Sequence, residues 1–452
     1  MLESKKGRRR FVRDLLIVGG GLGAFGGSLG GIVQLARAGG PQASHRHHVF
    51  AYFSGGWDVL LSLDPRDPAA FPEEDLGDHR IQPAYDQLQS SEGALVTAGG
   101  MTFGPHIGAL ATHADKLAVI RGMSMDTLTH EVGRRRFLTG KPPSGLQARG
   151  SSGATWLASR LGREESIPHL AVSVESYNVD QPTYASATRV QSSSDLVQLL
   201  RAGSVQLDDA QDALLQGFLQ AQAGCERSRH STQLRTAEQA RVRMRGMLEA
   251  DIATLFDLDH ASMATLKGEF GVPAREYGGP EAQALIAYQA LTHGISRCVS
   301  IQAASGLDTH FTEWNRDHGP RQERGFGAIA KLVEHLEGTP YEAVPGTTWM
   351  DHTVIVGFSE FMRTPILNDR GGRDHWLTNS CFLLGGNVQP GVIGASSDIG
   401  MSPQPVDLTT GEVSSDGEII LPEHVLRTLM VDAGITEDED DLRVEPIAAL
   451  MR

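Results

Sequence analysis

The sequence predicts an α/β fold built on a parallel sheet, and two of its features carry that prediction. Short apolar runs rich in β-branched and aromatic residues alternate along the chain with longer stretches of helical periodicity, as in proteins whose strands are joined by crossover helices. The chain also has 452 residues. That length suits one large α/β domain with insertions, or two domains.

The predicted elements are strands, helices and turn-rich loops, and each group is given in chain order. Residues 45–48 are expected to be mobile, 122–129 form a predicted loop, and the turn-rich segment 395–417 is assigned no element. The predicted strands are 49–53, 117–120, 167–174, 298–303, 353–358 and 382–385. The predicted helices are 130–139, 282–297 and 322–336, together with a helical insertion at about 193–267.

The first 38 residues have the layout of a cleaved export signal. The segment 8–13 reads Arg-Arg-Arg-Phe-Val-Arg and fits the R-R-x-F-x-[KR] pattern of twin-arginine signals. A weakly apolar run follows over 15–33, and Ala36-Arg37-Ala38 supplies a small-x-small cleavage site. We therefore predict a signal peptide at 1–38, a mature domain at 39–452, and a periplasmic or extracellular location.

Two other interpretations of this segment are weaker. Its glycines make it a poor membrane anchor, and the run is barely long enough to cross a bilayer. Residues 21–26 spell G-x-G-x-x-G, but about twenty positions later the chain offers His45, Arg46 and His47 instead of the acidic residue that a dinucleotide site needs. We reject the dinucleotide site.

Charge and cysteine content exclude several classes of partner. The formal charge is −15, and residues 39–452 carry 33 basic against 53 acidic residues, or −20. This balance argues against nucleic acid as a partner. No stretch after residue 38 is long and apolar enough to span a membrane. The three cysteines are widely spaced, so they indicate neither a disulfide framework nor a C-x-x-C metal site.

Carboxylates and imidazoles follow several of the predicted strands. Sites in open parallel sheets form beyond the carboxyl ends of the strands, and such side chains bind zinc, manganese, calcium or magnesium. A single Asp after a strand is more often a turn or cap residue, so spacing alone leaves a metal site and a purely structural role both open. The candidates are Asp58, His130, Asp308, His310, Glu360 and His375.

Around these candidates the sequence resembles a known family. The motifs are Gly55-Gly56-Trp57-Asp58, Asp308-Thr309-His310, Ser359-Glu360-Phe361-Met362-Arg363-Thr364-Pro365, Gly372-Arg373-Asp374-His375 and Gly385-Gly386. They resemble the exported bacterial family called domain of unknown function 1501. That family lies within the alkaline phosphatase and sulfatase superfamily. The resemblance implies a three-layer α/β/α sandwich with a mostly parallel sheet and one or two bound metals.

The resemblance also implies roles for individual residues. Segment 130–140 is similar to the sulfatase signature C-x-P-S-R-x-x-L-L-T-G, with Arg134 on its arginine, expected to bind an oxyanion. His130 falls on the nucleophile position and departs from the usual residue, so we expect it to act as a ligand, a general acid or base, or an unusual nucleophile. Arg363 is a weaker oxyanion candidate, since it can simply pair with a carboxylate. The implied metal ligands are Asp58, Asp308, His310, Glu360 and His375.

Two functions follow from this pattern. The first is a metal-dependent hydrolase of phosphate or sulfate esters, with a divalent ion (zinc, manganese or calcium) and a small-molecule or polymer ester as substrate. The second is a non-catalytic envelope protein that keeps the fold to bind an envelope partner. The histidine at the nucleophile position favours the second function, and the Asp, His and Glu residues at the strand ends favour the first.

Overall fold

The computed structural model describes residues 45–90, 93–145, 147–201, 207–226, single residues and short stretches between 230 and 247, 251–435 and 442–452. The predicted signal peptide lies outside these residues. In the described part of the chain, no helix is long and apolar enough to cross a membrane.

An eight-stranded sheet forms the centre of the molecule. All of its strands run in one direction except β11, which is antiparallel to both of its neighbours. The predicted α/β fold with a mostly parallel sheet is therefore confirmed. In spatial order the strands are β12 (Gly391–Ile393), β4 (Leu117–Ser124), β11 (Thr378–Leu384), β8 (Thr353–Phe358), β1 (His47–Phe53), β7 (Cys298–Ala304), β5 (His169–Val172) and β6 (Thr188–Val190).

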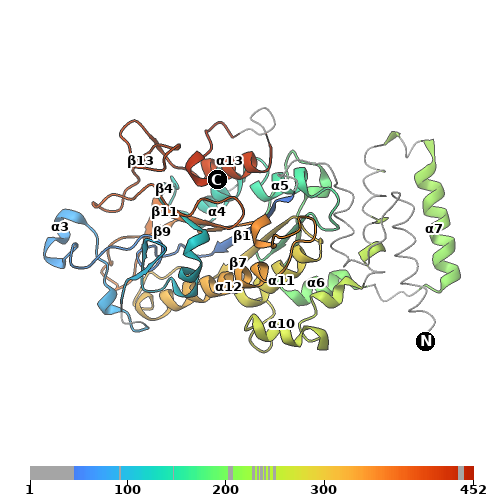
Figure 1. Cartoon of the computed structure of the whole chain (residues 1–452), viewed down its shortest axis with the longest axis horizontal. Helices are drawn as coiled ribbons and strands as arrows, with labels where there is room; N and C mark the ends of the chain where they lie inside the picture. The colour runs from blue at the N-terminus through green and yellow to red at the C-terminus, as the bar shows by residue number, and fades with distance from the viewer. Residues whose placement is uncertain are drawn as a thin grey trace.

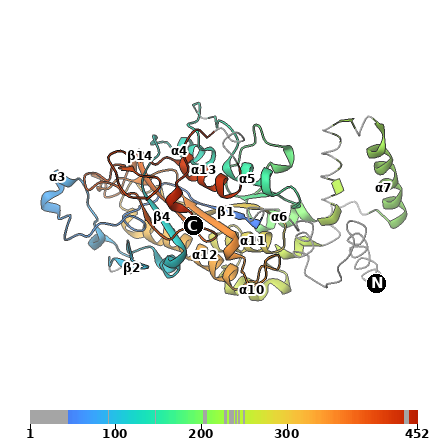
Figure 2. The same cartoon turned by 45° about the horizontal axis from the view of Figure 1, so that its top comes forward.

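The sheet is buried on both faces by helices, which makes three layers. Along β1 the side chains alternate between two hydrophobic cores, with Val49 and Ala51 in one and Phe50 and Tyr52 in the other. In Figures 1 and 2 the two groups of helices lie on opposite sides of the sheet. One group is α11 (Pro280–Thr292) and α12 (Gly319–Glu337), and the other is α4 (His130–Thr139), α5 (Gly153–Leu161) and α13 (Pro422–Asp432).

The remaining elements are short or lie apart from the sheet. In both views α7 stands away from the sheet (Figures 1 and 2). Helices α6 (Ser193–Leu200), α7 (Asp209–Gly224) and α10 (Ala264–Glu269) fall in or overlap segment 193–267, in agreement with its predicted helical character. A short helix, α3 (Leu76–His79), lies near the start of the domain. Three small antiparallel pairs complete the fold: β2 (Val96–Ala98) with β3 (Met101–Phe103), β9 (Met362–Arg363) with β10 (His375–Trp376), and β13 (Pro405–Val406) with β14 (Glu418–Ile419).

Several predicted boundaries are wrong, and each has a physical reason. Residues 47 and 48 are not mobile: they begin β1 and are buried, because they pair with β7 and β8 on either side. Strand β4 continues to Ser124 instead of ending before a loop at 122, since β11 pairs with it as far as that residue. Strands β6 and β12 were missed, as three residues are too few to show a period.

Candidate metal centre

Five of the sequence-predicted residues lie together at the edge of the sheet where the parallel strands end. Asp308 and His310 follow β7, Glu360 follows β8, and His130 is the first residue of α4, after β4. His375 reaches the same edge from the opposite chain direction, because β11 is antiparallel and His375 lies just before it. The antiparallel direction of β11 therefore explains why His375 lies with the other four residues.

Close backbone packing holds this edge in place. Gly55 has a φ of +115°, and a Cβ there would lie 2.6 Å from the backbone nitrogen of Asp308, so only glycine fits. Its own amide donates to Glu360 Oε1 at 2.9 Å. On the other side, β9 pairs with β10 and sets Arg363 opposite His375. The turn after β1 and the small β9–β10 ladder thus fix the positions of the polar side chains.

Three imidazoles converge on one carboxylate oxygen. The Nε2 atoms of His310, His130 and His375 lie 2.9, 3.2 and 3.3 Å from Asp308 Oδ1. The Nε2 atoms of His310 and His375 are 3.0 Å apart. The Asp308 side chain is 49% exposed, so this carboxylate group is partly open to solvent.

Each imidazole is oriented by a partner on its other ring nitrogen. His130 Nδ1 lies 2.7 Å from Glu360 Oε1, and His310 Nδ1 lies 2.5 Å from Asp374 Oδ1. His375 Nδ1 lies 2.7 Å from the carbonyl oxygen of Leu128, which can only accept a hydrogen bond. These partners place a proton on Nδ1 in all three rings and turn each Nε2 toward Asp308 Oδ1.

The arrangement fits a divalent metal ion. One ligand atom each from His130, Asp308 and His375 forms a group in which every pair lies within 4.8 Å. His130 Nε2 is buried and makes no hydrogen bond, although Asp308 Oδ1 is near. Two ligands at the usual zinc distance of about 2.0–2.1 Å lie about 3.3 Å apart in a tetrahedron, close to the observed separations. Imidazoles whose Nδ1 binds a carboxylate or carbonyl are typical of metal ligands.

The charges around the cluster are balanced by a buried arginine. Arg363 donates to Asp308 Oδ1 at 2.5 Å, to the Gly56 carbonyl at 3.0 Å and to the Gly55 carbonyl. Burial opposes the ionisation of Asp308, but the hydrogen bond and charge of Arg363 outweigh it and hold the pKa of Asp308 well below its ordinary value. Burial also disfavours a charged His130, yet its hydrogen bond to Glu360 raises the pKa of His130 above its ordinary value. Metal binding would therefore displace a proton from this ring.

The structure does not bring Asp58 into the cluster. Asp58 is buried, and its Oδ2 lies 2.9 Å from Arg373 Nε and accepts a hydrogen bond from Trp314 Nε1 at 2.8 Å. Its Oδ1 accepts from the amide of Leu60 at 3.1 Å. Both oxygens are therefore used in a buried ion pair, which explains the residue without a metal.

Glu360 and Arg134 also occupy positions that differ from the sequence prediction. Both oxygens of Glu360 are engaged, Oε1 by His130 and Gly55 and Oε2 by the Ser359 hydroxyl at 2.9 Å, so this residue orients the His130 ring. Arg134 pairs with Glu175 at 3.0 Å and lines a separate cavity. Arg363 pairs with the Asp308 carboxylate, which is the role that made it the weaker oxyanion candidate.

Sequence reasoning missed two contributors to the cluster. Asp374 lies in the same motif as His375, but its side chain orients His310, and nothing local to the sequence indicates that pairing. The Leu128 carbonyl holds His375 through the backbone, and a backbone contact leaves no signal in residue type.

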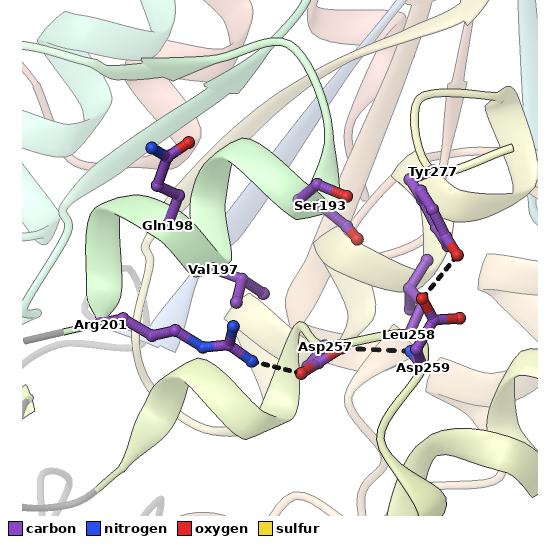
Figure 3. A pocket seen from close by; sticks show the side chains of 9 residues that line it. Ser193, Val197, Gln198, Arg201, Asp257, Leu258, Asp259 and Tyr277 are labelled. Carbon is purple, nitrogen blue, oxygen red and sulfur yellow. Dashed lines mark hydrogen bonds and ion pairs between the residues drawn. The ribbon is translucent and has the colours of Figure 1, made fainter. Parts of the chain in front are cut away.

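The structure has one cavity beside the helical segment and another at the carboxyl ends of the strands. The larger, of about 520 Å³, lies between α6 and residues 257–259 and is shown in Figure 3. The smaller, of about 230 Å³, lies at the ends of β1, β5, β6 and β7 and includes Arg134 in its lining.

Comparison with known proteins identifies the family. The family model described as "Protein of unknown function (DUF1501)" matches residues 46–414. A structure of Ps i-CgsB in complex with k-i-k-neocarrahexaose is similar with a TM-score of 0.39 and 10% identity, covering 90% of this chain and 75% of that one. The lipoteichoic acid synthase LtaP from Listeria monocytogenes is similar with a TM-score of 0.37 and 8% identity, covering 90% and 77%. A search of the curated proteins finds no match.

Proposed function

This chain belongs to the DUF1501 family, and from that premise and the geometry of the cluster we propose that it is a metal-binding hydrolase of phosphate or sulfate esters. The observation that carries the proposal is the convergence of three Nε2 atoms on Asp308 Oδ1, each ring being held by a separate partner on Nδ1. A structural role gives no reason for three imidazoles, each held at Nδ1, to turn Nε2 toward one carboxylate oxygen.

In this proposal His130, Asp308 and His375 hold the metal. They are the three residues whose ligand atoms all lie close to one another, and three protein ligands with an open position are typical of catalytic zinc. A bound divalent ion polarises the ester and lowers the pKa of water. Arg363 keeps Asp308 ionised, and Glu360 and the Leu128 carbonyl keep the two histidines turned toward the ion.

His310 is then the residue that accepts a proton. Asp374 Oδ1 lies 2.5 Å from His310 Nδ1 and accepts its proton in a hydrogen bond. His310 Nε2 is then the atom that takes the proton of an attacking water. The water oxygen forms a bond to phosphorus or sulfur, the bond to the ester oxygen breaks, and that oxygen leaves as an alcohol after protonation. In this proposal His130 takes the ligand role among the three that the sequence pattern left open, whereas His310 acts as the base instead of the predicted ligand.

Metal content is the first test. The purified protein, prepared without chelators, is expected to contain about one equivalent of zinc, manganese or calcium by elemental mass spectrometry, because Arg373 already neutralises Asp58 and leaves no second site there. Asp308→Ala and His375→Ala are expected to remove the metal, singly and together. His260→Ala, on the surface far along the chain, serves as the matched control and should keep it. A folded wild-type protein that holds no metal after incubation with divalent ions would contradict the proposal.

Export is a separate part of the proposal. We infer that residues 1–38 are removed during twin-arginine export and that the mature protein acts in the periplasm or outside the cell. The double substitution Arg8→Lys, Arg9→Lys keeps the charge but breaks the twin-arginine pattern. We expect the full-length variant to stay in the cytoplasm, as measured by fractionation and immunoblotting. Lys5→Arg, Lys6→Arg is the control, and equal export of both variants would exclude this route.

A non-catalytic envelope protein is the alternative function. Two features favour it. His130 stands at the position that the nucleophile occupies in the sulfatase signature, and Arg363 already neutralises Asp308. A protein that binds one metal but releases no product from p-nitrophenyl phosphate or p-nitrophenyl sulfate would support this alternative over the hydrolase.

A further inference from the structure

The smaller cavity lies at the same edge of the sheet as the cluster, and none of the proposed ligands lines it. Its volume is about 230 Å³, enough for on the order of seven or eight waters or a single small ring. It is lined from the ends of four neighbouring strands, by Tyr52 in β1, Ser54 after β1, Glu175 after β5, Arg189 in β6 and Gln302 in β7.

Two elements connect this cavity to the cluster. Arg134 reaches into the cavity from α4, one turn after His130. Ser54 lines the cavity and directly precedes Gly55, whose amide donates to Glu360. A substrate whose ester lies at the cluster would therefore extend its remaining part toward this cavity.

The cavity has a surplus of positive charge. Glu175 is its one acidic lining residue, and this carboxylate already pairs with Arg134 at 3.0 Å and Arg135 at 3.4 Å and accepts from the Tyr177 hydroxyl at 2.5 Å. Arg189 also lines the cavity, and no carboxylate of the described chain pairs with it. A net positive cavity in a chain of charge −15 indicates an anionic ligand.

The other lining groups are neutral and polar. The Tyr52 hydroxyl is buried with no hydrogen bond of regular geometry, and burial keeps its pKa well above the ordinary value, so it remains an O–H donor. The Gln302 side chain makes no hydrogen bond to any residue that the structure describes. Hydroxyl and amide groups of this kind match the alternating donors and acceptors of a hydroxylated ring.

From these observations we infer that the cavity is a subsite for one hydroxylated ring that carries a negative charge, such as a sugar acid, with Arg189 as the residue that selects the charge. The inference rests on the proposed function in one respect only, namely that the ring is the non-reacting part of an ester substrate. The substrate class is then an ester of an acidic saccharide.

The larger cavity does not compete for this role. In Figure 3 two pairs of its polar side chains are turned toward one another, Arg201 with Asp257 and the Tyr277 hydroxyl with Asp259. The interacting atoms of each pair lie 2.6 Å apart. Its arginine is neutralised within the cavity, and none of the cluster residues lines it. It therefore offers a matched control.

The test compares D-glucuronate with D-glucose, which share the ring hydroxyls and differ in the carboxylate. Ligand-observed NMR titrations of the full protein after chelator treatment would give both dissociation constants with the metal cluster empty. We expect glucuronate to bind at least tenfold more tightly than glucose. Arg189→Gln is expected to weaken glucuronate binding about 10- to 100-fold, as for the loss of a charge-assisted hydrogen bond, and to leave glucose unchanged.

The control variants separate this subsite from the rest of the protein. Arg201→Gln, the same substitution in the larger cavity, should not change glucuronate binding, and Gln302→Leu should weaken both sugars. Equal binding of the two sugars to wild type, or equal loss in the Arg189 and Arg201 variants, would overturn the subsite. Because Arg189 touches no metal ligand, a wild-type protein that binds metal but not glucuronate refutes the subsite alone. Glucuronate binding without metal binding refutes the proposed hydrolase alone.

Discussion

Substituting Arg373 with methionine is expected to destabilise the fold by about 3–5 kcal/mol, the usual cost of removing one partner of a buried ion pair. Arg373 is fully buried, and its Nε lies 2.9 Å from Asp58 Oδ2. It also donates to the carbonyls of Thr364 at 2.8 Å and Gln82 at 2.6 Å, so three loops lose contacts together. Urea denaturation followed by circular dichroism would measure the change in the free energy of unfolding.

The matched control is Arg316→Met. Arg316 is 65% exposed and pairs with its neighbour Asp317, and pairs of this kind contribute about 0–1 kcal/mol.

Asp58→Asn then decides the role of Asp58. We expect it to lower the stability and to leave the metal content at about one equivalent. Loss of metal with unchanged stability would instead show that Asp58 is a ligand, as its position after a strand suggests.

Asp58 and Asp308 show where sequence reasoning reaches its limit. Each follows a buried strand and lies in a polar motif, so the local signal is the same for both. What separates them is the tertiary partner: Arg373 and Trp314 enclose Asp58, whereas Arg363 and three imidazoles surround Asp308. Apart from His310, these partners are far away in sequence, and no periodicity records them.

The elements that were predicted well are those fixed by local chemistry. Strand β8 and helix α4 have the predicted bounds, since a buried apolar run defines the first and Gly140, in a left-handed conformation, ends the second. The candidate site residues at the carboxyl ends of strands are predicted from the same local sequence patterns. The position of His375 does not, because it depends on the reversed direction of β11, and strand direction is set by pairing and not by residue type.

Replacing His310 with glutamine is expected to lower kcat by about 10²- to 10⁴-fold, the usual contribution of a general base. Glutamine retains the polarity and approximate size of the side chain but cannot take a proton from water. In the proposed mechanism His310 is not a ligand, so the variant should keep about one equivalent of metal. Turnover of p-nitrophenyl phosphate or p-nitrophenyl sulfate, measured beside metal content on the same preparation, checks both statements.

Asp374→Asn provides the second variant of this test. Asp374 holds His310 Nδ1 at 2.5 Å and also pairs with the exposed Arg370, so its loss should lower kcat with little effect on KM or on metal content. If His310→Gln instead releases the metal, His310 is a ligand, as the resemblance to the superfamily implies. His130 would then be the remaining candidate for proton transfer, with Glu360 in the orienting position that Asp374 holds here, because a carboxylate holds Nδ1 of both imidazoles in the same way.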